Sequence, residues 1–360
     1  MKPTFRGLAS GLGKQLALRH KPRSAAARLG RAEAVSEARG ISVTADSTLL
    51  TYLQSMCRIR YFEDEVTRLK SDGMVAGSVH LCSGQEAIYV GACTALDLPR
   101  DAVFCTYRGH GWAIACGVPL VDLFGELLGR ETGVNGGRGG SAYLSSPRHG
   151  MYGENSIVGA GAPIAAGAAL AATFDRSNRV VLTAFGDGAM NQGSVHEAMN
   201  FAAVYTLPVL FLIENNHWSE LTPIASMVRS DRLFKRASSY GIPGVRIDGN
   251  DVAAVRDTVA EAAAHARKGG GPVVIEAMTQ RIVGHYIGDA QQYRTAEEID
   301  RAREAEPIAQ LSQLLRESTL SPAEVDIAMR AVHAEVREAA AEAERAPLAD
   351  PTTVLEHLYA

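Results

Sequence analysis

Two polar segments, each directly after a short apolar run, have the residue types that hold a divalent cation. Gly186-Asp187-Gly188 follows 180–185 (VVLTAF), and Asn215-Asn216 follows 209–213 (VLFLI). A carboxylate and an amide are hard oxygen donors, which suit a Mg²⁺ that keeps its other positions for phosphate oxygens and water. Gly188 would let the chain pass close to a phosphate, and a helix that begins after it would point its free N–H groups at the same anion.

A parallel sheet would bring the two segments together. Both apolar runs have strand character, and residues 189–205 between them show apolar positions at helical spacing until Pro208 ends the pattern. In such a β-α-β unit both strands end at the edge where open α/β folds bind ligands. We therefore expect Asp187 and Asn216 to lie near each other. The alternative is an ordinary strand-turn-helix in which Asp187 only caps the helix.

The rest of the chain continues the alternation of strands and helices. This pattern predicts an α/β fold with a doubly wound, mostly parallel sheet and helices on both faces. Further strands are expected at 103–106 and 272–278, and helices at 49–70, 83–98, 119–128, 161–174 and 322–344. The last helix has a strong start signal, with Ser321 as cap, Pro322 in the first position and Glu324 three residues after the cap.

Composition excludes several classes of protein. Of the 360 residues 46% are apolar and 21% charged, which is typical of a globular protein with a large core. A net charge of −4 gives no indication of a nucleic-acid or membrane partner. No apolar run approaches the roughly 20 residues that span a bilayer. The 5 cysteines include no Cys-x-x-Cys pair, so we expect reduced thiols and neither a disulfide scaffold nor a zinc site.

The N-terminal segment differs from the rest of the chain. It contains many Lys and Arg residues and no acid before Glu33. A mitochondrial transit peptide has this composition, and so does a disordered basic extension of a bacterial protein. We favour the second interpretation, with 1–47 as the extension and 48–360 as one folded domain.

Four further segments lie in a fixed order around the first two. They are 80–87 (HLCSGQEA), 107–111 (YRGHG), 136–141 (GGRGGS) leading to 156–160 (SIVGA), and 284–289 (GHYIGD) with 293–295 (YRT). Together with Gly-Asp-Gly and Asn-Asn, this order resembles the alpha subunit of the decarboxylating component of the 2-oxo acid (pyruvate and branched-chain) and acetoin dehydrogenases, over roughly 48–360. The resemblance implies the thiamine diphosphate-binding fold, with thiamine diphosphate and Mg²⁺ as cofactors.

The resemblance also implies roles for single residues. Asp187, Asn216 and the backbone carbonyl of Trp218 would hold the metal. The residues implied in cofactor binding are Tyr107, Arg108, Ser156, Val158, Gly186, Gly188, Asn191 and His285. Ser156 and Val158 would act through their backbone. Arg108 fits on chemical grounds as well, because a guanidinium clamps a phosphate with two parallel hydrogen bonds. The alternative for Arg108 is a surface salt bridge.

Three histidines are candidates for catalytic proton handling. His80, His110 and His285 lie in or beside polar, glycine-containing segments, and imidazole titrates near neutral pH. In the family, the residues that match His80 and His285 face the substrate end of the cofactor. The alternative for each is a structural histidine.

One group that the expected chemistry needs is not identifiable in this chain. Thiamine enzymes use a carboxylate that hydrogen-bonds to the pyrimidine ring, and we expect Glu86 to be structural instead. In the family the beta subunit supplies that carboxylate. The resemblance therefore implies a heterotetramer of two alpha and two beta chains, with no activity of this chain alone. The partner is expected to cover the Ala-rich stretch 161–174.

Substrate and acceptor are less constrained. The expected reaction cleaves the C–C bond next to the carbonyl of a small 2-oxo acid or acetoin and passes the acyl unit to the lipoyl group of an acyltransferase. A transketolase-like transfer of a two-carbon ketol or acyl unit from a ketose to a carrier protein stays open. Glu220-Leu221 is an unusual pair near the expected cofactor position, which indicates an unusual acyl donor.

Two further inferences concern the compartment and a different class of enzyme. Tyr286 stands where mitochondrial pyruvate enzymes have a regulatory serine, which favours a bacterial cytoplasmic protein over a mitochondrial one. A nicotinamide dehydrogenase is disfavoured, since Ile164 replaces the third glycine of the Gly159-Ala160-Gly161 pattern.

Overall fold

A parallel six-stranded sheet forms the centre of the computed structural model, which describes residues 46–356. The strand order is β2-β1-β3-β4-β8-β7, and every neighbouring pair is parallel. The strands are β1 (Ala102–Thr106), β2 (Met151–Asn155), β3 (Val181–Gly186), β4 (Val209–Asn215), β7 (Gly244–Asp248) and β8 (Val273–Met278). A short hairpin of β5 (Trp218–Ser219) and β6 (Thr222–Pro223) follows β4. The predicted α/β class with a mostly parallel sheet is confirmed.

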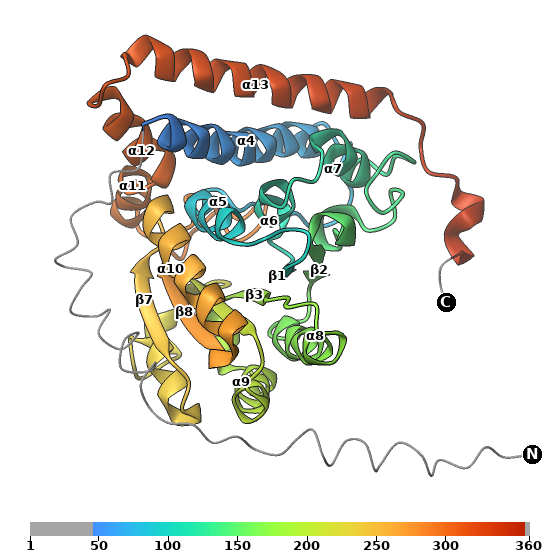
Figure 1. Cartoon of the computed structure of the whole chain (residues 1–360). Helices are drawn as coiled ribbons and strands as arrows, with labels where there is room; N and C mark the ends of the chain where they lie inside the picture. Colours follow the sequence, from blue (N-terminus) through green and yellow to red (C-terminus); the bar gives the residue numbers. More distant parts are fainter. Residues whose placement is uncertain (1–45, 357–360) are drawn as a thin grey trace, which may run out of the picture.

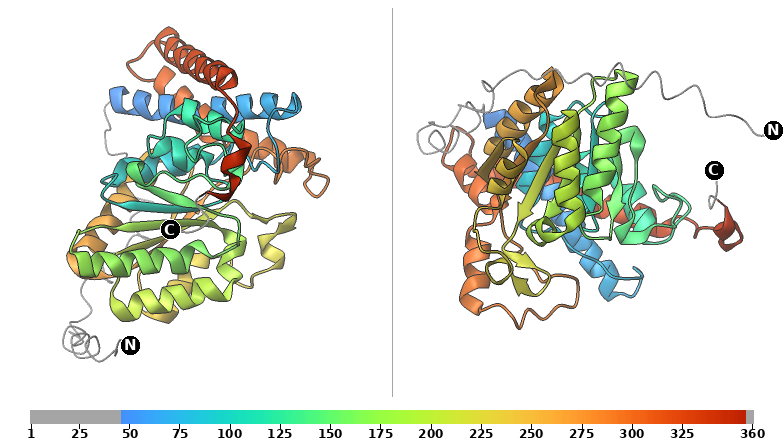
Figure 2. Two further views of the ribbon diagram at one scale, coloured as in Figure 1. Left: turned by 90° about the vertical axis from the view of Figure 1, so that its right-hand side faces the viewer. Right: turned by 90° about the horizontal axis from the view of Figure 1, so that it is seen from below.

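Helices cover both faces of this sheet (Figure 1). One face carries α4 (Asp46–Ser71), α5 (Glu86–Ala95), α6 (His110–Ala115), α7 (Leu120–Leu127), α10 (Val252–His265), α12 (Pro307–Arg316) and α13 (Pro322–Arg345). The other face carries α8 (Gly161–Asp175) and α9 (Gly193–Tyr205). In the left view of Figure 2, α13 and α4 lie at one side of the sheet and α8 and α9 at the opposite side. A further helix, α11 (Ala296–Glu304), precedes α12.

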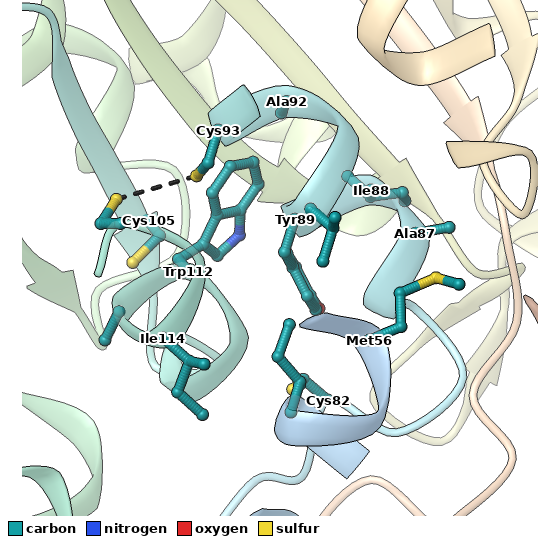
Figure 3. Packing of buried hydrophobic residues seen from close by; sticks show 14 of the residues in the cluster. Met56, Cys82, Ala87, Ile88, Tyr89, Ala92, Cys93, Cys105, Trp112 and Ile114 are labelled. Atoms are coloured by element: carbon teal, nitrogen blue, oxygen red, sulfur yellow. Dashed lines mark hydrogen bonds between the residues drawn. The ribbon is translucent and has the colours of Figure 1, made fainter. Parts of the chain in front are cut away.

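The central strands are largely apolar because both of their faces are buried. In β3, Leu182 and Ala184 belong to the core under α4, α5 and α10, whereas Val181 and Phe185 belong to the core under α8 and α9. Such strands lose the polar alternation of a half-exposed strand. Figure 3 shows part of the first core, where the ring of Tyr89 on α5 meets the ring of Trp112 on α6 edge to face. All 5 cysteines are buried free thiols.

Most expected elements are present, with shifted ends. The capping box at the start of α13 is confirmed, since Ser321 and Glu324 each bond the other's backbone N–H. The helix expected from 189 starts instead at Gly193, because η3 (Asp187–Asn191) is a 3₁₀ turn. Helix α4 begins at Asp46, two residues before the expected domain start. Residues 1–45 of the predicted extension lie outside the described residues. Between 46 and 356 no helix has the length and apolarity to cross a membrane.

Candidate active site

The carboxyl ends of neighbouring strands bring the predicted metal ligands to one edge of the sheet. Gly186, the last residue of β3, pairs with Glu214 of β4, so Asp187 and Asn216 follow at adjacent strand ends. The segment that contains Arg281 leaves β8 at the same edge, because Asn215 pairs with Met278. Tyr107 and Arg108 follow the end of β1, which lies on the other side of β3. This is the ligand-binding edge of an open α/β sheet.

Asp187 presents a buried carboxylate oxygen without a partner. The residue is 1% exposed, and its Oδ1 accepts a hydrogen bond from the N–H of Gly188 at 2.8 Å. No group in the described part of the chain bonds its Oδ2. Burial raises the pKa of Asp187 to about 6, although N–H groups of Gly188 and His217 act in the opposite direction. An unpaired buried carboxylate is costly unless a cation meets it, so the chemistry of this position fits a metal ion.

Asn216 is held so that its amide oxygen is turned away from Gln85. Its Nδ2 donates to Oε1 of Gln85 at 2.9 Å, and the Nε2 of Gln85 donates to the hydroxyl of Tyr89 at 2.7 Å. Among the described residues, the Oδ1 of Asn216 accepts only from the N–H of Trp218, at 3.2 Å, and an amide oxygen has two lone pairs. Residues 46–356 contain no cluster of three or more His, Cys, Asp or Glu that could bind a metal. A cation here would therefore draw on amide, backbone and ligand oxygens.

The two glycines at the end of β3 have different physical roles. A Cβ at Gly186 would meet no atom within 4 Å, so open space adjoins this residue, as a bound cofactor requires. A Cβ at Gly188 would lie 2.2 Å from Oγ and 2.6 Å from Cβ of Ser219. Gly188 thus lets the loop after β4 approach the turn after β3. Asn191 is exposed and bonds Arg236 at 2.9 Å, which ties η3 to η5 (Leu233–Tyr240).

Ser156 and Val158 lie between β2 and α8, on the rim of the sheet. Ser156 is partly exposed and Val158 is 45% exposed, next to Ile157 at 72%. The side chain of Asn155 accepts the N–H of Ile157 at 2.8 Å and fixes the turn. The backbone in this turn is available to a ligand or a partner chain.

Arg108 joins two loops at the centre of the site. It is 6% exposed, and its guanidinium donates to the carbonyl of Leu81 and, at 3.0 Å, to the carbonyl of His285. A guanidinium has five N–H donors, so donors remain for an anion. The segments that contain His80 and His285 are therefore drawn together by Arg108.

His80 and His285 are brought together, with Tyr107 beside them. The ring centroids of His80 and His285 are 4.9 Å apart, and His80 lies 4.5 Å from Tyr107. Burial and then the charge of Arg108 lower the pKa of His80 to about 4. Burial, Arg108 and Arg281 lower the pKa of His285 to about 3. Both imidazoles are consequently neutral near neutral pH.

His110 lies apart from them as a fully buried side chain. Its Nδ1 is 2.8 Å from Glu63 of α4, and its Nε2 is 2.9 Å from the hydroxyl of Ser141. Burial alone would lower the pKa of His110, but the Glu63 carboxylate raises it above the usual value. Glu63 also accepts the N–H of Cys82 at 2.8 Å. With both ring nitrogens occupied, His110 connects the glycine-rich loop and the 80–87 segment to α4.

Three buried residues of the site were not singled out from the sequence. Arg281 contacts His285, Gln85 orients Asn216, and Glu63 holds His110. A signal existed for Arg281, because it is a polar residue shortly after an apolar strand, as Asp187 is. Glu86, expected to be structural, is buried and bonds Arg60 at 2.7 Å and the N–H of Gly84 at 3.0 Å.

Fold and site together define an α/β protein with a buried carboxylate and a buried arginine at the ligand-binding edge of its sheet, and comparison with known proteins names the class. The chain belongs to the dehydrogenase E1 component family, whose profile matches residues 54–352. It is 40% identical over 321 residues to the alpha subunit of acetoin:2,6-dichlorophenolindophenol oxidoreductase of Bacillus subtilis, covering 89% of this chain and 96% of the relative.

Relatives with other names match over a similar length. The pyruvate dehydrogenase E1 component subunit alpha of Zymomonas mobilis is 38% identical over 301 residues, which cover 83% of this chain and 85% of the relative. The human mitochondrial somatic form is 37% identical over 311 residues, covering 86% and 78%. The predicted resemblance and the thiamine diphosphate-dependent class are confirmed.

Proposed function

We propose that this chain is the alpha subunit of a Mg²⁺- and thiamine diphosphate-dependent acetoin or 2-oxo acid dehydrogenase and works with a beta subunit. The observation that carries the metal assignment is the buried Oδ2 of Asp187, which has no partner among the described residues and lies at the strand end next to that of Asn216. Asp187, Asn216 and the carbonyl of Trp218 would bind the Mg²⁺. Its remaining positions would go to diphosphate oxygens and water.

The buried cations of the site supply the rest of the anion binding. Arg108 faces the same strand edge and keeps N–H donors free, and the phosphates would neutralise its charge. Gly186 leaves room for the cofactor. Bound thiamine diphosphate supplies the nucleophile that adds to a carbonyl and the electron sink for C–C cleavage.

The histidines then divide into two kinds. His80 and His285 are neutral and adjacent, so they are suited to orient a substrate carbonyl and to stabilise charge that develops on its oxygen. His110 has no free ring nitrogen. Its part in the reaction is therefore positional, since it holds Ser141 and the segment before α5 in place.

A beta chain completes the site. Each relative described above carries the name of an alpha subunit. Exposed apolar residues lie in the turn before α8 and along the helix: Ile157, Val158, Ile164 and Phe174. A partner that covers this surface would reach the cofactor from the side of Ser156 and Val158. It would supply the carboxylate that is expected to bond the pyrimidine ring of the cofactor.

The expected substrates are acetoin and small 2-oxo acids, with a lipoyl group on an acyltransferase as acceptor and the bacterial cytoplasm as location. The test is co-expression with the beta-type chain and measurement of dichlorophenolindophenol reduction with acetoin, pyruvate and branched-chain 2-oxo acids. We expect turnover only with both chains, Mg²⁺ and thiamine diphosphate. Turnover by this chain without the beta chain would contradict the proposal. So would an assembly whose only activity is transfer from ketose phosphates to a carrier protein.

A further inference from the structure

Two of the buried cysteines lie against each other near the ends of neighbouring helices. Cys93 is in the last turn of α5, and Cys116 directly follows α6. Their sulfur atoms are 3.8 Å apart, a contact that the dashed line from Cys93 marks in Figure 3. As a hydrogen bond this contact contributes little, because a thiol is a weak donor and a weak acceptor. The distance is more informative about what the two sulfur atoms could form together.

The pair lies directly beneath the surface of the protein. Cys93 is 6% exposed and Cys116 is 7% exposed. Each is followed by an exposed residue, Thr94 in one case and Gly117 in the other. A Cβ at Gly117 would meet no atom within 4 Å, so the turn after Cys116 has room to adjust. A small oxidant can therefore reach this pair more easily than the other three thiols, which are at most 2% exposed: Cys57, Cys82 and Cys105.

The surroundings of the pair favour neutral sulfur. The hydrogen bond with Cys116, and then burial, raise the pKa of the Cys93 thiol well above its usual value. Cys93 is consequently protonated near neutral pH. A disulfide carries no charge, so a buried position that disfavours a thiolate still accommodates the S–S bond. The two sulfur atoms of a disulfide are about 2.05 Å apart, and rotation of the two side chains about their Cα–Cβ bonds can bring them together.

A metal site does not explain the pair. Cys105 on β1 is the third thiol in this part of the core, and it acts on the pKa of Cys93. Its sulfur nevertheless approaches the carbonyl of Gly153, at 3.9 Å. Between residues 46 and 356 no three His, Cys, Asp or Glu side chains are arranged to hold a metal ion. The arrangement is that of a dithiol pair.

We propose that Cys93 and Cys116 are a modification site at which a peroxide forms a reversible disulfide that fastens α5 to α6. The peroxide oxidises one thiol to a sulfenic acid and is itself reduced, with release of one water. The sulfur of the second thiol then forms the S–S bond, and the sulfenic oxygen leaves as water with the proton of that thiol. A dithiol reductant returns both residues to thiols by exchange. The inference does not depend on the proposed function.

The disulfide should stabilise the fold and leave the candidate active site unchanged. Helix α5 follows Gln85, which orients Asn216, and α6 begins at His110. The crosslink joins the opposite ends of these two helices and breaks none of the hydrogen bonds at the site. It closes the loop 93–116 in the unfolded chain as well. We expect the apparent Tm to rise on the order of 5 °C, with no loss of kcat.

Peptide mass mapping of the assembled enzyme tests the site directly. Trypsin cleaves after Lys and Arg, so Cys93 falls in 71–100, Cys105 in 101–108 and Cys116 in 109–130. The assembly is treated with hydrogen peroxide and unfolded in the presence of an alkylating agent, which blocks the remaining thiols. We expect 71–100 linked to 109–130, with fragment ions that place the bond at Cys93 and not at Cys82. Treatment with dithiothreitol before alkylation should remove the linked peptide.

An internal standard makes a negative result decisive. Met227 is 41% exposed, and its conversion to the sulfoxide shows that peroxide has reacted with the protein. If Cys93 and Cys116 were then recovered as separate alkylated thiols or as sulfinic acids, the proposal would be wrong. A bond to Cys105 would also refute it. An assembly that contains the linked peptide but is inactive on all tested substrates would refute the proposed function alone.

Three serine variants test whether this disulfide is the source of the stabilisation. Cys93→Ser and Cys116→Ser each leave one thiol without its sulfur partner, so the rise of Tm on peroxide treatment should disappear. Cys57→Ser is the matched control, because Cys57 is a buried thiol of α4 that bonds Tyr61 instead. C57S should keep the full rise of Tm. An equal rise in C93S or C116S would overturn the stabilising role of the crosslink.

Discussion

Replacement of Asp187 by Asn should stabilise the cofactor-free protein and abolish the stabilisation that Mg²⁺ and thiamine diphosphate give to the wild type. Burial raises the pKa of Asp187 from 3.8 to about 6. A difference of about 2 units at roughly 1.4 kcal/mol each amounts to about 3 kcal/mol. Because the folded pKa is higher than the unfolded one, the favourable contribution is complete below pH 3.8 and is lost as pH rises through about 6.

Urea unfolding of the cofactor-free chain between pH 4 and pH 8 measures this contribution. The stability difference between D187N and the wild type should shift in favour of D187N by up to about 3 kcal/mol across that range. The change of this stability difference with pH is the informative quantity, because any effect of the amide that does not depend on pH is the same at every pH. Mg²⁺ and thiamine diphosphate at 100 times Kd should then stabilise the wild-type assembly by about 2.7 kcal/mol and leave D187N unchanged.

Asp248→Asn serves as the matched control. Asp248 ends β7, and partial burial raises the pKa of its carboxyl as well, but the residue keeps contact with solvent and is not one of the proposed ligands. D248N should show a smaller pH-dependent gain and a normal response to cofactor. If D187N bound Mg²⁺ and thiamine diphosphate as tightly as the wild type, Asp187 would not be a metal ligand. If the stability difference between D187N and the wild type did not change with pH, burial would not raise the pKa of the Asp187 carboxyl.

Three other substitutions test separate parts of the structure. In Gly188→Ala the new methyl group should clash with Ser219 and weaken cofactor binding, which a thermal-shift titration of the assembly measures. The double variant with Ser219→Gly should restore cofactor binding. If it does not, the clash is not the cause of the weaker binding. Burial raises the pKa of Glu154 from 4.5 to about 8, so the wild type should lose up to about 1.4 kcal/mol per pH unit between those values relative to Glu154→Gln; parallel stability curves from urea titrations would argue against this. Ile164→Asp, at a 48% exposed position of α8, should leave the chain folded but prevent sedimentation with the beta chain, whereas Ile327→Asp on α13, 59% exposed, should assemble normally.

The sequence pattern predicted the central strands of the sheet but not its two edge strands. β3, β4 and β8 are mostly apolar because helices bury both of their faces. The two strands of the six-stranded sheet that were missed, β2 and β7, are the outermost in its order. Their sequences, MYGEN and GVRID, contain glycine and charged residues that an incompletely buried edge strand tolerates. Local patterns do not distinguish such segments from loops.

Some residues of the candidate site could likewise be placed from the sequence, and others could not. Residues directly at strand ends, such as Asp187 and Asn216, can be placed from the order of strands alone. The burial of His110 cannot, because its partner Glu63 lies on a helix 47 residues earlier in the chain. The contact between Arg281 and His285 likewise depends on anchors from the loops of Glu220 and Tyr293. These pairings come from tertiary packing, which a spacing pattern does not encode.

The most direct test of the metal site is a crystal structure of the assembled alpha and beta chains with thiamine diphosphate and Mn²⁺ in place of Mg²⁺. The anomalous signal of Mn²⁺ should give one peak within about 2–2.5 Å of the side-chain oxygens of Asp187 and Asn216, with diphosphate oxygens on its other side. A peak that these two residues do not reach, or a diphosphate bound without a metal at this edge of the sheet, would contradict the account.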